Sequence, residues 1–253
     1  TYCSLIRKRI SKRFGGKLVA FISGGAALNP EIGYFFFSLG VRIIQGYGQT
    51  ESSPLISANP PNKPKIETVG PAIKGIEVKL SDENELLVKG DCVMKGYWKQ
   101  EKETAETIKD GWLYTGDLAK IDNEGYITLI DRKKEIIVNS GGDNIAPVRP
   151  EAALTVQSII QQAMVSGDRR PYLVAVIVPD PELSSKLNED ELEKNIAEAV
   201  NEANKGLSQI ERIRKYIVVS EPFSTDNGMF TATMKIRRHK VRESYGETLD
   251  ALY

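Results

Sequence analysis

Cysteine and histidine are both scarce in this sequence. Cys3 and Cys92 are its two cysteines, they lie far apart with no CxxC spacing, and His239 is the one histidine. Zinc sites and disulfide frameworks require closely spaced or paired cysteines. We therefore expect neither kind of site, and expect instead two reduced thiols, as is typical of cytoplasmic proteins.

Net charge and long apolar runs are also lacking. The 34 basic and 34 acidic residues cancel, so the overall charge gives no reason to expect nucleic acid or another polyanion as a partner. The most apolar runs, residues 34–41 and 173–178, are far shorter than the roughly 18 residues of a membrane-spanning helix. We expect a cytoplasmic protein without a transmembrane segment, a description that leaves room for peripheral contact with the inner face of a membrane.

The sequence does not begin with methionine. Thr1 is its first residue and Met94 its first methionine, so we interpret the chain as a fragment or a processed product. Its 253 residues are 41% apolar and 27% charged, which is an ordinary globular composition. A chain of this length can bury the core of one large domain or of two ordinary ones.

The first part of the chain has the pattern of a parallel α/β unit. Residues 18–23 are a short apolar run ending in two glycines, which predicts a buried strand followed by a turn. Asn29 and Pro30 suit the N-cap and first position of a helix that continues over residues 32–39. Residues 41–44 predict a second strand. Strand, helix and strand in this order indicate a βαβ unit of a parallel sheet.

Two further patterns follow. From residue 59 to residue 131, prolines are followed by the short strand-like runs IEVKL, ELLVKG and YITLID with glycine-bearing turns, which indicates a small antiparallel barrel or sheet. Residues 132–253 predict a separate α+β domain. Its expected elements are a helix over residues 151–161, a central strand over 172–179, an amphipathic helix opened by Asn188 and a strand over 216–219.

Two short motifs place polar groups beside the expected strands. Residues 46–51 read GYGQTE directly after the second strand, at the end where α/β sheets bind ligands. Tyr47 offers a flat ring for a base, while Thr50 and Glu51 offer oxygens for a phosphate-bound metal. Asp117, in a YTGD motif, offers two oxygens for the hydroxyls of a ribose. For both motifs the alternative is an ordinary turn with an exposed acid.

Two other segments are rich in charge. Residues 131–135 are five consecutive charged residues, and residues 140–144 follow with a glycine pair. This arrangement suits either a solvated loop or a joint between domains that reaches a nucleotide. Residues 228–242 contain five basic residues and no acid, which indicates either a stripe that binds anions or nucleic acid, or a solvated helix face. The five are Lys235, Arg237, Arg238, Lys240 and Arg242.

In their order and spacing, these segments resemble the downstream motifs of the adenylate-forming superfamily, which includes acyl-CoA synthetases, firefly luciferase and peptide-synthetase adenylation domains. GYGQTESSP, GWLYTGDLAKID, LIDRKKEIIVNSGGDNIAP, GDRRPYLVAVIVPD and MKIRR are most similar to bacterial long-chain fatty acyl-CoA ligases. The resemblance covers nearly the whole chain. It implies a carboxyl-terminal half, in which residues 1–131 complete a large domain (an α/β piece over 1–58 and a β-barrel over 59–131) and residues 132–253 form a mobile α+β lid.

The resemblance also implies a reaction and a nucleotide site. Enzymes of this family use ATP and magnesium to convert a fatty acid to an acyl-adenylate, and then transfer the acyl group to the thiol of CoA with release of AMP. Tyr47 would stack on adenine, and Asp117 and Arg132 would bind the ribose hydroxyls. Three residues would place backbone against the adenine and acyl group: Gly24, Gly25 and Ala26.

The remaining implied roles concern catalysis and motion. Thr50 would contact phosphate, and Glu51 would hold Mg²⁺. Lys235 would be the adenylation lysine, since a positioned cation stabilises negative charge that gathers on phosphate oxygens. It follows a polar, turn-forming segment, residues 225–233, so we expect it on or beside an exposed loop. Lys134 would be the hinge about which the lid rotates. Two glycines would border the tunnel for the pantetheine of CoA: Gly141 and Gly142.

The sequence departs from the family pattern in two ways. Ala232 stands where the family has proline, three residues before Lys235. The Ser/Thr/Gly-rich phosphate loop of the family is absent from these residues and would lie in a missing amino-terminal half of the enzyme. We therefore expect the chain to be inactive alone. The alternatives are a non-catalytic remnant that binds nucleotide at most, or a piece of an enzyme that adenylates another acyl or aryl acid.

Overall fold

The computed structural model describes residues 2–26 and 28–253. The side chain of Cys3, one of the two thiols discussed above, lies outside the described part, whereas Cys92 is a half-buried free thiol. The chain divides into two compact units. The first unit ends at Lys134, and the second unit comprises Glu135–Tyr253. The division into domains at residue 131 stays a prediction.

The first unit begins with a βαβ arrangement, as predicted. Strands β1 and β2 pair in parallel, with Ser23 opposite Gln45 at the end of the register. The Asn29 side chain accepts a hydrogen bond from the Glu31 amide at the start of α2, and Pro30 is the first helical residue. The elements of this part are α1 (Tyr2–Arg13), β1 (Phe21–Ser23), α2 (Pro30–Ser38), β2 (Ile43–Tyr47) and β3 (Ser57–Ala58).

Two details of this part differ from the prediction. The first strand is only three residues long and it is not buried, because it pairs on one side alone and Ile22 is 77% exposed. The second strand starts two residues later than expected and runs through Gly46 to Tyr47. This shift matters for the site, because it places Tyr47 on a strand within the core rather than in a turn.

The rest of the first unit is a five-stranded antiparallel sheet, in agreement with the predicted antiparallel barrel or sheet. The long strand β7 is central to it, since its first half pairs with β5 and β6 and its second half pairs with β8. The apolar core includes Tyr47, Leu86 and Leu113. The elements are β4 (Ile76–Leu80), β5 (Glu85–Gly90), α3 (Glu101–Thr107), β6 (Ile108–Lys109), β7 (Trp112–Ile121) and β8 (Ile127–Arg132), with the short 3₁₀ helix η1 at Thr50–Ser52.

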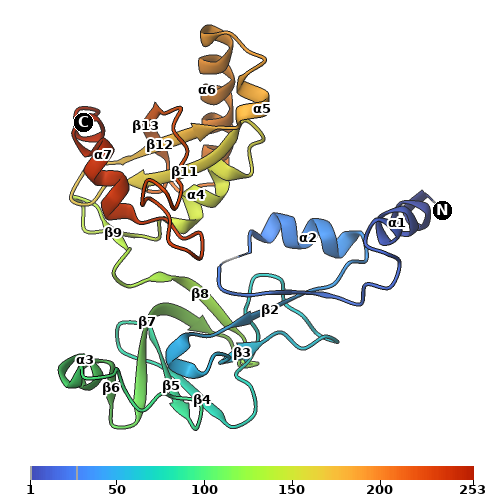
Figure 1. Ribbon diagram of the computed structural model, residues 1–253, viewed down its shortest axis with the longest axis vertical. Coiled ribbons are helices and arrows are strands. Elements are labelled where there is room, and N and C mark those ends of the chain that lie inside the picture. The colour runs from blue at the N-terminus through green and yellow to red at the C-terminus, as the bar shows by residue number, and fades with distance from the viewer. Residues whose placement is uncertain (1, 27) are drawn as a thin grey trace. The chain divides into compact units, whose positions relative to one another are not determined.

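The second unit is α+β, as expected, and has three layers (Figure 1). Its sheet has the order β11-β12-β13, with the fully buried β12 in the centre. One face packs on α4 and α6, and the other packs on α7 and the segment before it. The elements are β9 (Ile137–Val138), β10 (Asn144–Ile145), α4 (Val148–Thr155), β11 (Ile160–Ser166), β12 (Leu173–Pro179), α5 (Pro181–Ser184), α6 (Glu189–Lys205), β13 (Ile213–Val218) and α7 (Arg238–Asp250).

The helix predicted over residues 151–161 is wrong in its second half. Helix α4 ends at Thr155, and β11 begins at Ile160. Ile159 and Ile160 are β-branched residues that favour a strand, and Ile160 pairs with Pro179 at the end of the central strand. The capping box of α6 is confirmed, because Asn188 and Glu191 each accept a hydrogen bond from the other's amide.

Candidate functional site

The GYGQTE motif lies where β2 leaves the sheet. Strand β2 ends at Tyr47, and the chain then turns through Gly48 into η1. A Cβ atom on residue 48 would lie 1.6 Å from the carbonyl oxygen of Pro54, so the close passage of two backbone segments requires glycine there. The Ser52 hydroxyl accepts from the Gln49 amide and donates to the Gln49 carbonyl, which fixes the turn.

Four side chains meet beside this turn. Three come from the strands β2, β7 and β8, and the fourth, Gln49, comes from the turn itself. Asp117 on β7 is the common partner: its Oδ2 accepts hydrogen bonds from the Tyr47 hydroxyl and from Gln49 Nε2, the latter at 2.6 Å. Its Oδ1 pairs with Arg132 Nε at 2.8 Å. Asp117 and Arg132 are opposite each other in the register of β7 and β8. We call Tyr47, Gln49, Asp117 and Arg132 the tyrosine–aspartate cluster.

Burial differs sharply within the cluster. The Asp117 side chain is 10% exposed, whereas the Arg132 side chain is 48% exposed. Burial, followed by the nearby Asp117 charge, raises the pKa of Tyr47 well above its usual value, so the phenol stays protonated and donates. The cluster therefore has a buried carboxylate with a half-exposed cation at its outer side.

These contacts bear on the roles expected for the same residues. A carboxylate has about four acceptor positions, and the internal partners of Asp117 use three of them. The ring of Tyr47 is 8% exposed and belongs to the apolar core. The ribose role of Asp117 and the stacking role of Tyr47 both stay predictions. One acceptor position of the Asp117 carboxylate remains for a sugar hydroxyl, and a second hydroxyl would need Arg132 or Gln49 to exchange its partner.

Glu51 has an aromatic partner that the sequence did not indicate. Its Oε1 accepts a hydrogen bond from the Tyr97 hydroxyl at 2.9 Å, and its backbone carbonyl accepts from the Met94 amide. No described residue contacts Oε2, and the described residues contain no group of three or more His, Cys, Asp or Glu that could hold a metal. One carboxylate fits Mg²⁺, which proteins usually bind through one or two carboxylates together with substrate phosphates. The exposed side chain of Thr50 lies beside it in sequence.

The glycine-rich segment after β1 approaches the same strand end. Ser23, the last residue of β1, pairs with Gln45, and a Cβ atom on Gly24 would lie 3.3 Å from the carbonyl oxygen of Gly46. Gly25 and Ala26 follow and are exposed. The structure thus brings Gly24 next to the GYGQTE motif within the first unit.

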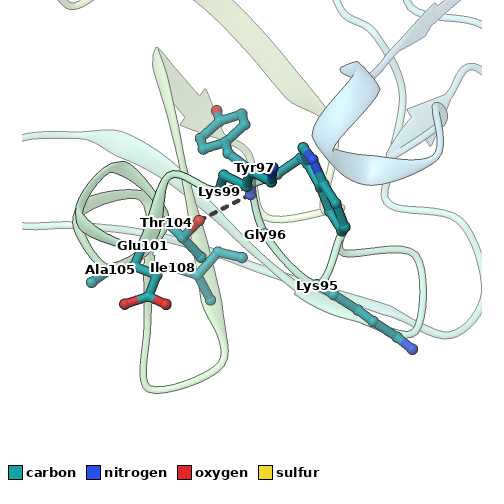
Figure 2. Close-up of a pocket in the computed structure, with 9 residues that line it drawn as sticks. Lys95, Gly96, Tyr97, Lys99, Glu101, Thr104, Ala105 and Ile108 are labelled. Carbon is teal, nitrogen blue, oxygen red and sulfur yellow. Dashed lines mark hydrogen bonds between the residues drawn. The ribbon is translucent and has the colours of Figure 1, made fainter.

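Tyr97 also lines a surface cavity (Figure 2). Its volume is about 480 Å³, and it lies between the loop that includes Tyr97 and the helix α3. The amide of Tyr97 donates to Thr104 Oγ1 at 2.9 Å, which joins the two walls. Trp98 is 85% exposed. The loop that carries Tyr97 to Glu51 therefore also forms the wall of a surface cavity.

The lysine expected at the hinge and the glycine pair expected at the pantetheine tunnel both lie in turns. Lys134 is exposed in the turn after β8 and is the last residue of the first unit, whereas its neighbour Lys133 pairs with Glu83 and Glu85. Gly141 and Gly142 lie in the second unit, in the tight turn between β9 and β10. The Asn139 side chain closes that turn by accepting from the amides of Gly141 and Asp143. The hinge and tunnel roles stay predictions.

Lys235 lies on an exposed loop before α7. The Thr231 amide donates to the Lys235 carbonyl and the Lys235 amide donates to Thr231 Oγ1, while the lysine side chain points to solvent with no ion pair to any described residue. Ile236 packs toward the apolar cluster under α7, in which Val241 is fully buried. This exposure is as expected for the lysine, and its catalytic role stays a prediction.

The basic stripe suggested by residues 228–242 does not exist as a single surface. Arg238 is held by Glu151 and Glu135, Lys240 pairs with Glu243, and Arg242 binds the Ser166 hydroxyl and lies 3.6 Å from Asp250. The acidic partners of Arg238 come from elsewhere in the chain, so the run of sequence could not show them, whereas Glu243 and Asp250 lie on α7 itself. Nucleic-acid binding, which the balanced charge of the chain gave no reason to expect, is not proposed for this segment.

The predicted site residues fall into two groups. Gly24, Tyr47, Glu51, Asp117 and Arg132 belong to the first unit, and they surround the end of β2. Gly141, Gly142 and Lys235 belong to the second unit. Sequence reasoning missed Gln49, Tyr97 and the Arg238–Glu151 pair. For Gln49 the signal was its place inside the GYGQTE motif, whereas nothing in the sequence pointed to Tyr97 or Glu151.

Comparison with known proteins gives two family matches. The family described as AMP-binding enzyme matches residues 4–98, and the AMP-binding enzyme C-terminal domain matches residues 134–253. The chain is 37% identical over 265 residues to a long-chain fatty acid–CoA ligase, FadD15, of Mycobacterium bovis. That alignment covers 98% of this chain and 44% of the relative, so the chain spans less than half the length of the relative.

Solved structures give the same result at the level of the fold. The adenylation domain of a carboxylate reductase from Mycobacterium chelonae has a TM-score of 0.85 at 28% identity, over 99% of this chain and 41% of that one. The corresponding domain from Segniliparus rugosus, solved with AMP and a co-purified carboxylic acid, has a TM-score of 0.82 at 28% identity, over 97% and 41%. None of the described helices combines the length and the apolar character that crossing a membrane requires.

Proposed function

This chain belongs to the AMP-binding enzyme family, and we propose that it forms part of an AMP-forming long-chain fatty acid–CoA ligase. The reaction is that of a complete enzyme. This chain covers 44% of the length of the Mycobacterium bovis relative. Its substrates would be a fatty acid, ATP and CoA, and its partner would be the portion of the enzyme that carries the phosphate loop.

The proposed chemistry has two steps. A carboxylate oxygen of the fatty acid attacks the α-phosphorus of ATP, the bond to the β-phosphate oxygen breaks, and pyrophosphate leaves. The thiol of CoA then attacks the acyl carbonyl, loses its proton, and AMP leaves. Lys235 would stabilise the phosphate oxygens in the first step, and Thr50 would hold phosphate. Glu51 would hold Mg²⁺, which supplies charge neutralisation at the phosphates when bound.

The observation that supports nucleotide binding is the tyrosine–aspartate cluster. A carboxylate fixed by three internal donors, one of them the half-exposed Arg132, beside the end of the parallel strand β2, is suited to bind a sugar hydroxyl. The phenol and amide of the cluster hold Asp117 in place before any ligand arrives. This preorganisation favours nucleotide binding even by the isolated chain.

Calorimetry with AMP and the isolated chain tests this proposal. We expect weak AMP binding that Asp117→Ala weakens by roughly 1.5–3 kcal/mol, the worth of a hydrogen bond to a charged group. Asp82→Ala, in the exposed turn before β5, is the matched control and should leave binding unchanged. Equal affinities of wild type and Asp117→Ala would remove the ribose assignment.

The rival proposal is a non-catalytic chain that binds nucleotide at most. A pyrophosphate-exchange assay with palmitate separates the two cases when the chain is measured alone and again together with the portion of the enzyme that carries the phosphate loop, because only a ligase portion gains exchange from that addition. We expect no appreciable exchange, because triphosphate binding lacks the backbone donors of a phosphate loop. Robust exchange by the purified chain would show that it needs no partner portion.

A second candidate is adenylation of a different acyl or aryl acid, which the carboxylate-reductase neighbours favour. Non-hydrolysable acyl-AMP analogues discriminate between acids without requiring turnover. We expect a palmitoyl analogue to bind the chain more tightly than a benzoyl analogue, since a long apolar chain buries more surface. The reverse order would favour the aryl-acid reading.

We also propose a cytoplasmic location for the enzyme, because its two cysteines are few and widely spaced in the sequence. Cys92 is free, and burial raises the pKa of its thiol, which makes it a poor nucleophile. Thiol labelling of Cys92 in intact cells, which requires a reduced cysteine, tests the compartment.

A further inference from the structure

The starting point is a group of three charged side chains inside the second unit. The Arg238 guanidinium, at the start of α7, forms two hydrogen bonds with the Glu151 carboxylate, at 2.6 and 2.7 Å. Its Nε donates to Glu135 Oε2 at 3.1 Å. We call Arg238, Glu151 and Glu135 the charged triad.

The triad joins the layers of the unit. Helices α7 and α4 cover opposite faces of the sheet (Figure 1), and Arg238 reaches from one to the other past the edge strand β11. Glu151 Oε1 also accepts from the Val165 amide of β11 at 2.8 Å. The bidentate pairing with a planar guanidinium fixes direction as well as distance, which a lysine could not do.

The charges of the triad are strongly held. Burial opposes the charged guanidinium, but the Glu151 and Glu135 carboxylates more than offset this and raise the pKa of Arg238. The Glu151 side chain is 11% exposed and the Arg238 side chain 21%, whereas Glu135 is 42% exposed. Glu151 is therefore the buried partner of Arg238. Glu135 is the more exposed partner, so it can be substituted without disturbing the core.

Two members of the triad lie close in sequence to lysines with expected roles, Lys134 at the hinge and Lys235 in adenylation. Glu135 directly follows Lys134, and Arg238 is three residues after Lys235. Between Lys235 and Arg238 the chain is held by the Phe230–Ile236 bridge and by the Arg237 amide, which donates to the Met229 carbonyl at 2.7 Å. Glu135 thus adjoins Lys134 directly, and a short, hydrogen-bonded segment separates Arg238 from Lys235.

From this geometry we propose that Arg238 is a positioning residue that couples the segment after Lys134 to the Lys235 loop, so that the two move as one body. The proposal rests on the function assigned above to Lys235. Because of this coupling, a rotation about the joint at Lys134 would move the Lys235 loop together with the segment after Lys134. Arg238 itself touches no substrate.

Hydrogen exchange measured by mass spectrometry on the isolated chain tests this coupling without requiring activity, so a failure of the proposed ligase function would not affect the result. We expect Arg238→Lys, which keeps the charge but loses the bidentate pair, to speed exchange of residues 231–237 about tenfold. Glu135→Gln should speed exchange of the same residues about threefold, although it lies about a hundred positions away in sequence.

Two controls separate positioning from general stability. Glu243→Gln removes an exposed carboxylate that pairs with Lys240 on α7 and should leave exchange at 231–237 unchanged. The amides of β12 should exchange at the wild-type rate in Glu135→Gln, since that variant does not reach the core. In the double variant, Glu135→Gln should add nothing to the effect of Arg238→Lys, because both break one connection.

Three results would overturn the proposal. They are wild-type exchange at 231–237 in Glu135→Gln, equal acceleration of residues 231–237 and β12 in both variants, and additive effects in the double variant. The second would assign Arg238 a purely structural role. Should Arg238→Lys fail to fold, Glu135→Gln alone still decides between coupling and its absence.

Discussion

Asp117 shows how single residues gain their properties from neighbours. As a residue in a YTGD motif it is one acid among many, yet in the structure it is buried, accepts from Tyr47 and Gln49, and pairs with Arg132. The cost of burying its charge is offset by these three partners. The contact with a sugar hydroxyl that we propose for Asp117 would depend on these partners as much as on Asp117 itself.

The Tyr47 hydroxyl can be removed without removing the ring. Tyr47→Phe should lower the free energy of unfolding of the first unit by about 1 kcal/mol, because Asp117 loses one donor but keeps two. Both tryptophans, Trp98 and Trp112, belong to the first unit, so urea unfolding followed by tryptophan fluorescence reports it. Tyr34→Phe, which removes an exposed hydroxyl bonded to Glu67, is the control. An equal loss in both variants would contradict a special role for the buried bond.

The same hydroxyl predicts a pH dependence. Burial and the Asp117 charge raise the folded-state pKa of Tyr47 above its unfolded value of about 10. The stabilisation is therefore fully present below about pH 10 and is lost as the pH rises above it, when the unfolded phenol ionises first. We expect the stability of the first unit to fall more steeply above pH 10 in wild type than in Tyr47→Phe. Parallel pH curves would show that the phenol does not contribute.

The catalytic role proposed for Lys235 can be tested in the complete enzyme. Lys235→Ala should impair formation of the acyl-adenylate far more than transfer from preformed acyl-AMP to CoA, because its charge is needed where phosphate oxygens gain negative charge. Lys240→Ala, on the same segment but paired with Glu243, is the control. The two half-reactions are measured separately, by pyrophosphate release and by thioester formation. An equal loss in both would make Lys235 structural.

At the scale of elements, helix α6 depends on local capping and on its apolar face. Its capping box uses Asn188 and Glu191, and Ile196, Ala199, Val200 and Ala203 face the core. Asn188→Ala should destabilise the second unit by about 1 kcal/mol and speed exchange of the β12 core amides about fivefold. Glu198→Ala, on the exposed face of the same helix, should change exchange little. Equal exchange rates of the β12 amides in the two variants would show that the N-cap of α6 does not limit the stability of the second unit.

Helix α4 and strand β11 show where local pattern misleads. Residues 151–161 suggest one helix, but the chain turns after Thr155 and enters the sheet at Ile160. Short apolar runs suit a buried helix and a buried strand equally well, and pairing with β12 decides the outcome here. The strand β1 is the opposite case, since its residues suggest burial and the structure leaves them exposed.

At the scale of the whole molecule, the chain is two compact units that join between Lys134 and Glu135. Lys134 is exposed in a turn, while Lys133 is held by two carboxylates. A lysine-specific protease at low concentration should therefore cut first after Lys134 and release two fragments that resist further digestion. First cleavage within α6, at the exposed Lys194, would contradict the joint as the most accessible segment.

The sequence by itself determined the family, the order of the elements and the residue types of the site. Ordered motifs such as GYGQTE and YTGD, the capping signals at Asn29 and Asn188, and the apolar run of β12 are local features, so they can be seen without the fold. Local features also predicted that Lys235 would be exposed, because polar and turn-forming residues precede it.

Only the tertiary structure decided the partners. Tyr47 and Asp117 are 70 positions apart, and Arg238 and Glu151 are 87 apart, so their pairing depends on how strands and helices pack. The same packing divided the basic run at residues 228–242, because Arg238 turned inward to Glu151 while Lys235 remained in solvent. The charges of a sequence can be summed without knowing the fold. The energy of each charge depends on its distance from other charges and on its burial, and only the fold sets these.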